Sequence, residues 1–285
     1  RIMVTVKFIR DDGKEFLIDN VTWKIPSDGL VGFDSVPHEI KTQANAQMDG
    51  SKTQSKRVAE KDRTVTAVLV NRNLNSTMRE IVQRFFGVKR DFKVYVNYNG
   101  NEKYCEGSLY AFSMPTENIY GFITMEVTIL SPQPYLLSVD EFGKNIGGLE
   151  GGLEFDFEIP EEGIEFDRFS FAQEVDISND GDVETFMRAV MIAKGEVVNP
   201  TLKKGDYFIR ILDTMQEDDV IEIDFVKTPP TVKKNGVNII SKTTRDSNFK
   251  DMVLSIGTNT IGYEADTGDT ALDVYIYYNK RYGGM

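Results

Sequence analysis

Alternation of apolar and polar residues with a period of two is the dominant pattern along this chain. Successive side chains of a β-strand point to opposite faces of a sheet, so a half-buried strand requires this alternation. The pattern occurs in six segments, namely residues 2–8, 92–98, 122–130, 153–159, 221–225 and 272–278. It therefore predicts a mainly β protein.

One segment instead repeats its apolar residues at helical spacing. The apolar stripe consists of Met78, Ile81, Val82, Phe85 and Phe86, as on a helix with one buried face. Thr77 and Glu80 match a capping box at its start. Gly87 matches the left-handed position just after its end. We predict a helix over residues 76–86 that covers one face of a sheet.

Two prolines within three residues mark a boundary between domains. Pro132 and Pro134 cannot donate to a sheet ladder and favour an extended linker. The chain has 285 residues, which is long enough for two cores. We predict a β-rich N-terminal domain with one helix over residues 1–138 and an antiparallel β-sandwich over residues 139–285.

Turn signals divide the second half into short strands. They are the dipeptides Asp180-Gly181, Gly205-Asp206, Asn235-Gly236 and Thr267-Gly268. These residue types tolerate the backbone conformations that tight turns need. The Asn-Gly pair between Lys234 and Val237 predicts a two-residue hairpin.

A long polar stretch interrupts the first half between Asp34 and Arg63. Residues 48–51, Met-Asp-Gly-Ser, resemble a hairpin turn. A polar segment of this length without an apolar face is typical of a functional or mobile excursion from the core.

The net charge of -12 is distributed unevenly. Residues 1–138 carry 18 Lys and Arg against 16 Asp and Glu, whereas residues 139–285 carry 15 against 29. A strongly acidic half repels phosphate backbones, which argues against specific nucleic-acid binding. No apolar run approaches the ~20 residues of a membrane span, so no membrane insertion is expected. Residues 1–4 show no pattern of a signal peptide.

Candidate catalytic and metal-ligating residues are few. His38 and Cys105 are the only residues of their types. A Ser-His-Asp or Cys-His site would require His38, which lies in a polar segment without a nucleophile elbow. A Cys/His zinc site needs more ligands than the chain has. We interpret Cys105 as a half-buried strand residue without a charged setting. No catalytic, cofactor-binding or metal-binding residue is predicted.

Acidic and glycine-rich segments were weighed for chemistry as well. Residues 161–162 and 217–219 are acidic, but they fit solvated turns better than a glycosidase pair with one raised pKa,. Residues 179–182 resemble part of a calcium loop, but Glu184 follows too early to close it,. Residues 147–152 contain four glycines without the following Lys and helix of a phosphate loop,.

An alternative function is a carbohydrate-binding module or a glycan hydrolase acting at a cell surface. Sugar sites on sandwich folds use aromatic platforms. The candidates here are Tyr275, Tyr277, Tyr278 and Tyr282. A fold analogy by itself does not locate a site.

The order of motifs in the last third is the most specific feature of the chain. The motifs are Gly181–Thr185, Val197–Leu202, Asp219–Asp224, Lys234–Asn238, Gly257–Asp266 and Val274–Tyr278. Residues 131–135, Ser-Pro-Gln-Pro-Tyr, close the first half. In this order the motifs resemble the distal tail protein (Dit) family of long-tailed, siphovirus-type phages and prophages.

The resemblance implies a non-enzymatic structural protein of the virion tail tip, assembled in the bacterial host cytoplasm. Residues 1–138 would form the ring domain of a homo-hexamer that continues the tail tube, and residues 139–285 a galectin-like sandwich. The implied partners are the tail tube protein and a tail-associated fibre or lysin protein, with tape-measure and receptor-binding proteins as further candidates. The polar stretch 34–63 would line or seal the ring. No cofactor is implied.

Overall fold

The computed structural model describes residues 4–45, 48–116, 121–139, 142–145 and 174–285. The chain forms two compact units. The first comprises residues 1–139 together with 281–285, and the second comprises residues 140–280. The predicted second domain, 139–285, differs from the second unit at both ends, because residue 139 and residues 281–285 belong to the first unit.

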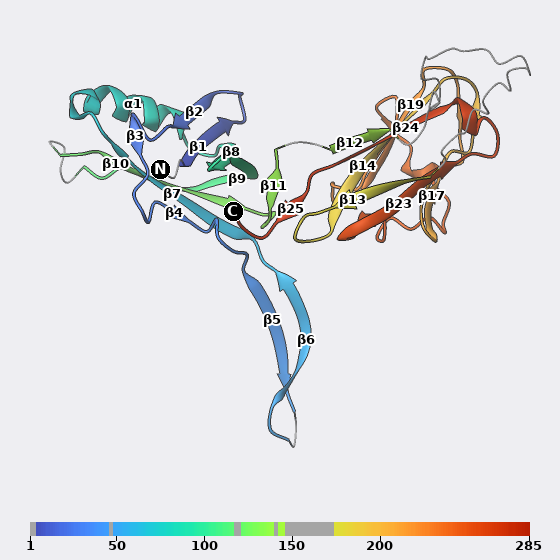
Figure 1. Cartoon of the computed structure of the whole chain (residues 1–285), viewed down its shortest axis with the longest axis horizontal. Coiled ribbons are helices and arrows are strands. Elements are labelled where there is room, and N and C mark those ends of the chain that lie inside the picture. Colours follow the sequence, from blue (N-terminus) through green and yellow to red (C-terminus); the bar gives the residue numbers. More distant parts are fainter. Residues whose placement is uncertain (1–3, 46–47, 117–120, 140–141, 146–173) are drawn as a thin grey trace, which may run out of the picture. The chain divides into compact units, whose positions relative to one another are not determined.

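The first unit is built on an antiparallel sheet that follows the order β2-β1-β8-β9-β10-β7-β3, with β4, β11 and β25 attached to it (Figure 1). The strand bounds are β1 (Val4–Arg10), β2 (Glu15–Ile18), β3 (Trp23–Lys24), β4 (Leu30–Val31), β7 (Lys61–Leu69), β8 (Asp91–Tyr98), β9 (Asn101–Ser113), β10 (Thr124–Ser131), β11 (Leu136–Ser138) and β25 (Arg281–Tyr282). The alternating segments 2–8, 92–98 and 122–130 thus become β1, β8 and β10, which confirms those predictions.

Helix α1 (Asn75–Phe85) covers one face of this sheet. Its buried side packs on apolar residues of the strands, and the Phe8 and Phe86 rings meet edge to face at 5.1 Å. Arg10 donates from Nη1 to the carbonyl oxygens of Arg84 and Phe85, at 3.1 and 2.9 Å. The last carbonyls of a helix have no partner within it, so this arginine satisfies the C-terminal end of α1.

The structure corrects the predicted ends of this helix. A short 3-10 helix, η1 (Arg72–Leu74), precedes it, and Leu74 occupies the N-cap without a side-chain cap, so the Thr77–Glu80 capping box is absent. Gly87 does not have a positive φ. Ile81, placed in the apolar stripe, is 47% exposed. The sheet covers a narrower stripe of the helix than its periodicity suggested.

The second unit contains two antiparallel sheets. One contains β12 (Phe142–Asn145), β24 (Leu272–Tyr278), β14 (Thr185–Ala193), β19 (Val220–Asp224), β20 (Thr231–Lys234), β21 (Val237–Asn238) and β22 (Val253–Leu254). The other contains β13 (Glu174–Asn179), β23 (Gly257–Glu264), β16 (Thr201–Lys204) and β17 (Tyr207–Arg210). A small pair, β15 (Val197–Val198) with β18 (Thr214–Met215), and two short helices, η2 (Ile240–Lys242) and η3 (Asp269–Ala271), complete the described part.

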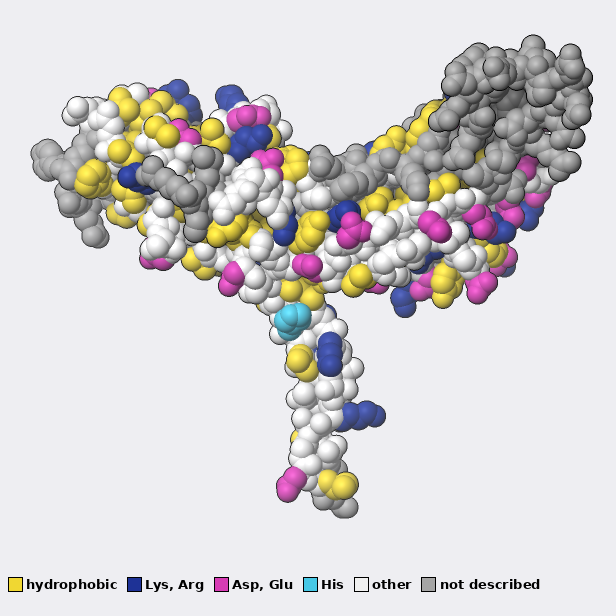
Figure 2. Space-filling view, viewed as in Figure 1, with side chains coloured by type: hydrophobic (Ala, Val, Ile, Leu, Met, Phe, Trp, Pro, Cys, Tyr) yellow, Lys and Arg dark blue, Asp and Glu magenta, His cyan; other side chains and the backbone are white. Residues whose placement is uncertain are grey.

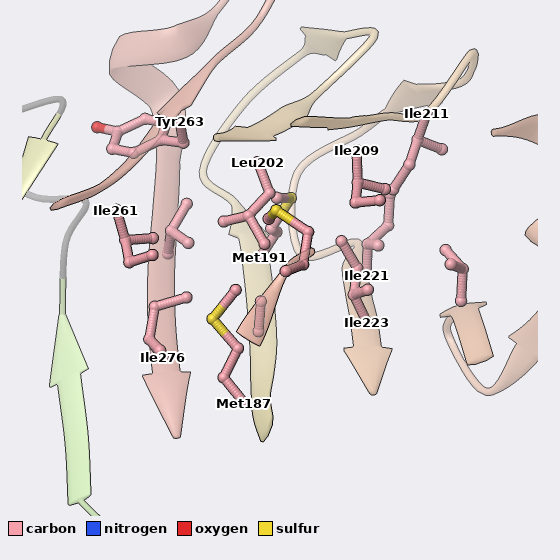
Figure 3. Packing of buried hydrophobic residues seen from close by; sticks show 14 of the residues in the cluster. Met187, Met191, Leu202, Ile209, Ile211, Ile221, Ile223, Ile261, Tyr263 and Ile276 are labelled. Carbon is pink, nitrogen blue, oxygen red and sulfur yellow. The ribbon is translucent and has the colours of Figure 1, made fainter. Parts of the chain in front are cut away.

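Both sheets of the second unit contribute to one apolar core (Figure 3). Met191 and Ile276 come from the first sheet and Leu202 and Ile261 from the second, and all four side chains are fully buried. Inward residues of two sheets that share one core define a sandwich. The mainly β fold with one α-helix in the described residues is confirmed, as are the strands predicted over 221–225 and 272–278. The strand predicted over 153–159 lies outside the described residues.

The predicted hairpin between Lys234 and Val237 is confirmed. These two residues pair across the turn, and Asn235 and Gly236 both have positive φ, 49° and 81°. Two successive left-handed residues make the turn whose twist matches a two-stranded ribbon.

Candidate functional site

The most unusual surface of the chain is a hairpin that projects from the first unit (Figure 1). Its strands are β5 (His38–Ala44) and β6 (Ser51–Val58), which pair only with each other in the described chain. His38 pairs with Val58 at the root and Ala44 with Ser51 near the turn, with one irregularity between Lys41 and Thr42. Strands β5 and β6, which lie within the polar stretch 34–63, therefore form an extended arm.

This arm has no core of its own. Nearly every residue of β5 and β6 is exposed, and Ile40, an apolar residue in the middle of β5, is 57% exposed. Figure 2 shows the arm standing clear of the bulk of its unit. A two-stranded hairpin without a covering layer is marginally stable in water. Its outer edges also present unpaired backbone groups. The hairpin is therefore suited to contact another polypeptide.

Charge on the arm is moderately positive. Over residues 38–58 the basic side chains are Lys41, Lys52, Lys56 and Arg57, against two acids, Glu39 and Asp49. Arg57 donates from Nε to Glu39 across the strands at 2.5 Å. This hydrogen bond holds the pKa of the Glu39 carboxyl below its usual value. An exposed pair of this kind fixes strand register more than it adds stability.

A buried arginine contacts the chain that leads into the hairpin. Arg63 on β7 is 2% exposed. Its guanidinium lies over the ring of Phe33 and its Nη2 donates to the carbonyl oxygen of Pro134. Burial lowers the pKa of this guanidinium, which has Cys105 beside it. One side chain thereby joins three segments: the chain entering the hairpin, the strand leaving it, and the linker after β10.

The two residues that could serve nucleophilic chemistry, His38 and Cys105, lie on different strands in different surroundings. His38 is exposed at the first position of β5. Cys105 is fully buried on β9, where burial raises the pKa of its thiol and Arg63 opposes that rise. The uncharged setting predicted for Cys105 is thus wrong. Arg63 lies 42 residues away in sequence, so no local pattern could have revealed the neighbour.

Two acidic residues in described turns of the second unit, Asp180 and Asp219, make structural contacts. Asp180 accepts from Lys280 Nζ at 2.5 Å and from Ser178 Oγ at 2.7 Å, and these bonds lower the pKa of its carboxyl. Asp219 contacts Lys234 Nζ at 2.8 Å. Among the described residues, no group of His, Cys, Asp and Glu side chains is placed to hold a metal ion.

The four tyrosines of the carbohydrate alternative do not form one exposed platform within the second unit. Tyr278 is buried and donates to the carbonyl oxygen of Ser178 at 3.0 Å. Tyr282 belongs to the first unit. Tyr275 and Tyr277 remain side by side on β24, with ring centroids 6.5 Å apart. The Arg188 guanidinium lies 5.0 Å from the Tyr277 ring and so occupies a face of that ring, which weakens it as a sugar platform.

In the described part of the chain, no helix is long and apolar enough to span a bilayer.

Comparison with known proteins gives a consistent result. Residues 180–282 match the family described as the siphovirus-type tail component, C-terminal domain. This match confirms the resemblance that the sequence motifs suggested. No curated protein matches the chain significantly by sequence.

Solved structures resemble the chain over almost its whole length. SPP1 Dit, described as a paradigm of the hub adsorption apparatus in phages infecting Gram-positive bacteria, has a TM-score of 0.67 at 12% identity, covering 97% of this chain and 98% of that one. The phage p2 baseplate in its activated conformation gives TM-scores of 0.54 with Ca and 0.56 with Sr. These matches have 10% and 9% identity and cover 100% and 99% of both chains. At such identities the likeness establishes a shared fold.

Proposed function

Because residues 180–282 match the siphovirus-type tail component family and the motifs of the chain resemble those of distal tail proteins, we propose that this protein is a structural distal tail protein at the tip of a phage or prophage tail. It acts through assembly and not through catalysis. The first unit forms a closed ring of six copies, which joins the tail tube to a fibre or lysin protein. The second unit contacts receptor-binding proteins or the host.

The observation that carries this proposal is the β5–β6 arm. Its exposed strands contribute nothing to the core of their own unit, so selection for stability of the single chain does not account for them. A repeated head-to-tail contact closes into a ring when an arm on one copy fits a different surface of the next. The arm gives each copy such a projecting element, and its moderate charge suits a channel that passes nucleic acid without holding it.

Mass measurement of the full chain in solution, followed by electron microscopy, tests the proposal. We expect hexameric rings at high concentration or on addition of the tail tube partner. Replacing residues 42–54 with Asn-Gly leaves Lys41 opposite Ser55, so the root pairing of the hairpin is retained,. We expect this short-arm variant to fold and to remain monomeric.

Two results would count against the proposal. A wild-type chain that stays monomeric in the presence of its tail partners would contradict the proposed ring. A short-arm variant that assembles as well as wild type would show that the arm does not form the contact between copies, although the ring itself still forms.

A further inference from the structure

Residues 281–285 belong to the first unit although the chain reaches them only after passing through the second. Strand β25 pairs with β11, with Tyr282 opposite Leu136 and Arg281 opposite Leu137. Lys103 on β9 donates from Nζ to the carbonyl oxygen of Gly284 at 2.7 Å and lies 4.0 Å from the centroid of the Tyr282 ring. The segment is therefore held by backbone pairing and by the buried side chain of Lys103.

Beyond Tyr282 the segment packs against the chain that enters the hairpin. The Met285 amide donates to the carbonyl oxygen of Phe33 at 2.9 Å. A Cβ on Gly284 would lie 2.6 Å from the carbonyl oxygen of Asp34, so this contact accepts only glycine. Strand β5 begins at His38, four residues after Asp34. Residues 281–285 thus contact the chain just before the hairpin root, at Phe33 and Asp34, while Arg63 lies over the Phe33 ring.

Two chain segments connect the first unit to the second. The residues that flank these segments pair with each other on both sides of the connection. On the first unit Leu137 is opposite Arg281, and in the second unit residue 142 of β12 is opposite Tyr278 of β24. Only a few residues separate these pairs on each connection. When the second unit is folded, the loop that must close for residues 281–285 to reach β11 is consequently short, and little loop entropy opposes their docking.

Unfolding the second unit removes this advantage. The docking segment would then close a loop of about 140 residues instead of one of about six. Effective concentration falls roughly as the −3/2 power of loop length, so docking weakens roughly 100-fold. The order of the hairpin root then depends on whether the distant sandwich is folded.

We propose that residues 281–285 are a strap that fixes the root of the β5–β6 hairpin and makes its order depend on the second unit. The strap needs no partner chain and does not depend on ring formation. It acts in the single chain in solution, where the order of the hairpin root can be measured directly.

Hydrogen exchange of the full-length protein, read by mass spectrometry, tests the strap. In Gly284→Val the new side chain meets the Asp34 carbonyl, and we expect the hairpin-root amides, including Ala59, which donates to Pro37, to exchange at least tenfold faster. Amides of β8 should keep their wild-type protection. Gly87→Ala is the matched control, because its Cβ would meet only the Arg84 oxygen, at 3.6 Å. Unchanged exchange at the root, or equal loss of protection across β8, would overturn the proposal.

A second variant tests the dependence on the sandwich. Ile223 is fully buried in the second unit, and Ile223→Asp places a charge in that core. We expect the second unit to lose protection, β8 to keep it, and root amides to exchange up to 100-fold faster. Glu222→Gln, on the neighbouring half-buried position, should change neither unit. A root that remains protected while the second unit exchanges freely would show that the strap holds without the sandwich, which contradicts the proposed dependence.

Discussion

Arg63 places its guanidinium 5.9 Å from the ring centroid of Phe33, where the hairpin leaves the first unit. Its Nε and Nη1 have no oxygen acceptor in the described structure. A buried charge without a carboxylate partner is costly, and apolar residues of similar volume often replace such charges without loss of stability.

We therefore expect the free energy of unfolding of Arg63→Met to lie within about 1 kcal/mol of the wild-type value, or to exceed it. Arg63→Ala should be less stable than Arg63→Met by about 2–5 kcal/mol, because it also removes packing over Phe33. Trp23 is the only tryptophan and is buried in the first unit, so its fluorescence during urea unfolding reports that unit. A large loss of stability in Arg63→Met would mean that the charge itself stabilises the root.

Gly107 on β9 should not tolerate a side chain. A Cβ there would lie 2.3 Å from the Leu130 carbonyl oxygen and 2.7 Å from Ile129 Cγ2. Overpacking of this kind typically costs about 1–3 kcal/mol, so we expect Gly107→Ala to destabilise the first unit by that amount in the Trp23 assay. Gly87→Ala serves as the control and should be neutral or slightly stabilising, since Gly87 has no positive φ,. Equal stability of the two variants would contradict the geometry of β9.

Acid should destabilise the second unit through Asp219. The Lys234 ammonium, with the Gln216 amide and the Asn235 side chain, lowers the pKa of Asp219 from 3.8 to about 2. Because the folded pKa is below the ordinary one, the ionised form stabilises the fold above about pH 4, and that contribution is lost as the pH falls toward 2. Asp219→Asn should flatten this part of the pH dependence in urea unfolding followed by circular dichroism. Asp218→Asn, at the adjacent exposed position, should leave it as in wild type.

The apolar side chain on the arm should matter for assembly and not for folding. Ile40 is 57% exposed, so Ile40→Glu should leave the Trp23 unfolding curve unchanged, while a contact that buries this side chain would be lost. We expect ring formation to weaken at least tenfold in mass photometry. Val237→Glu is the matched control, at a 67% exposed apolar position in the second unit. Rings that form normally from Ile40→Glu would place this face of the arm outside the contact.

Periodicity and turn chemistry predicted most of the strands and turns found in the described residues. The alternation in residues 92–98 predicts a strand because neighbouring side chains alone decide which face is apolar. Asn235-Gly236 predicts its turn because the two residues accept positive φ without help from the fold. The long polar stretch 34–63 was recognised as an excursion, since it has no apolar face to bury.

Local sequence patterns did not predict the features that depend on residues distant in the chain. The exposure of Ile81 depends on how far the sheet extends beneath α1, and Phe86, not Gly87, caps the end of that helix. Tyr278 and Tyr282 are four residues apart, yet one is buried in the sandwich core and the other lies against Lys103 in the first unit.

By itself, the sequence determined the mainly β class, the positions of most strands and turns, the polar arm and the family resemblance, because each follows from residues close together in the chain. Only the tertiary structure decided that Arg63 lies beside Cys105, and that residues 281–285 return to the first unit and contact Phe33. Those contacts join residues tens to hundreds of positions apart, and they depend on strand pairing and shared burial, which no local pattern encodes.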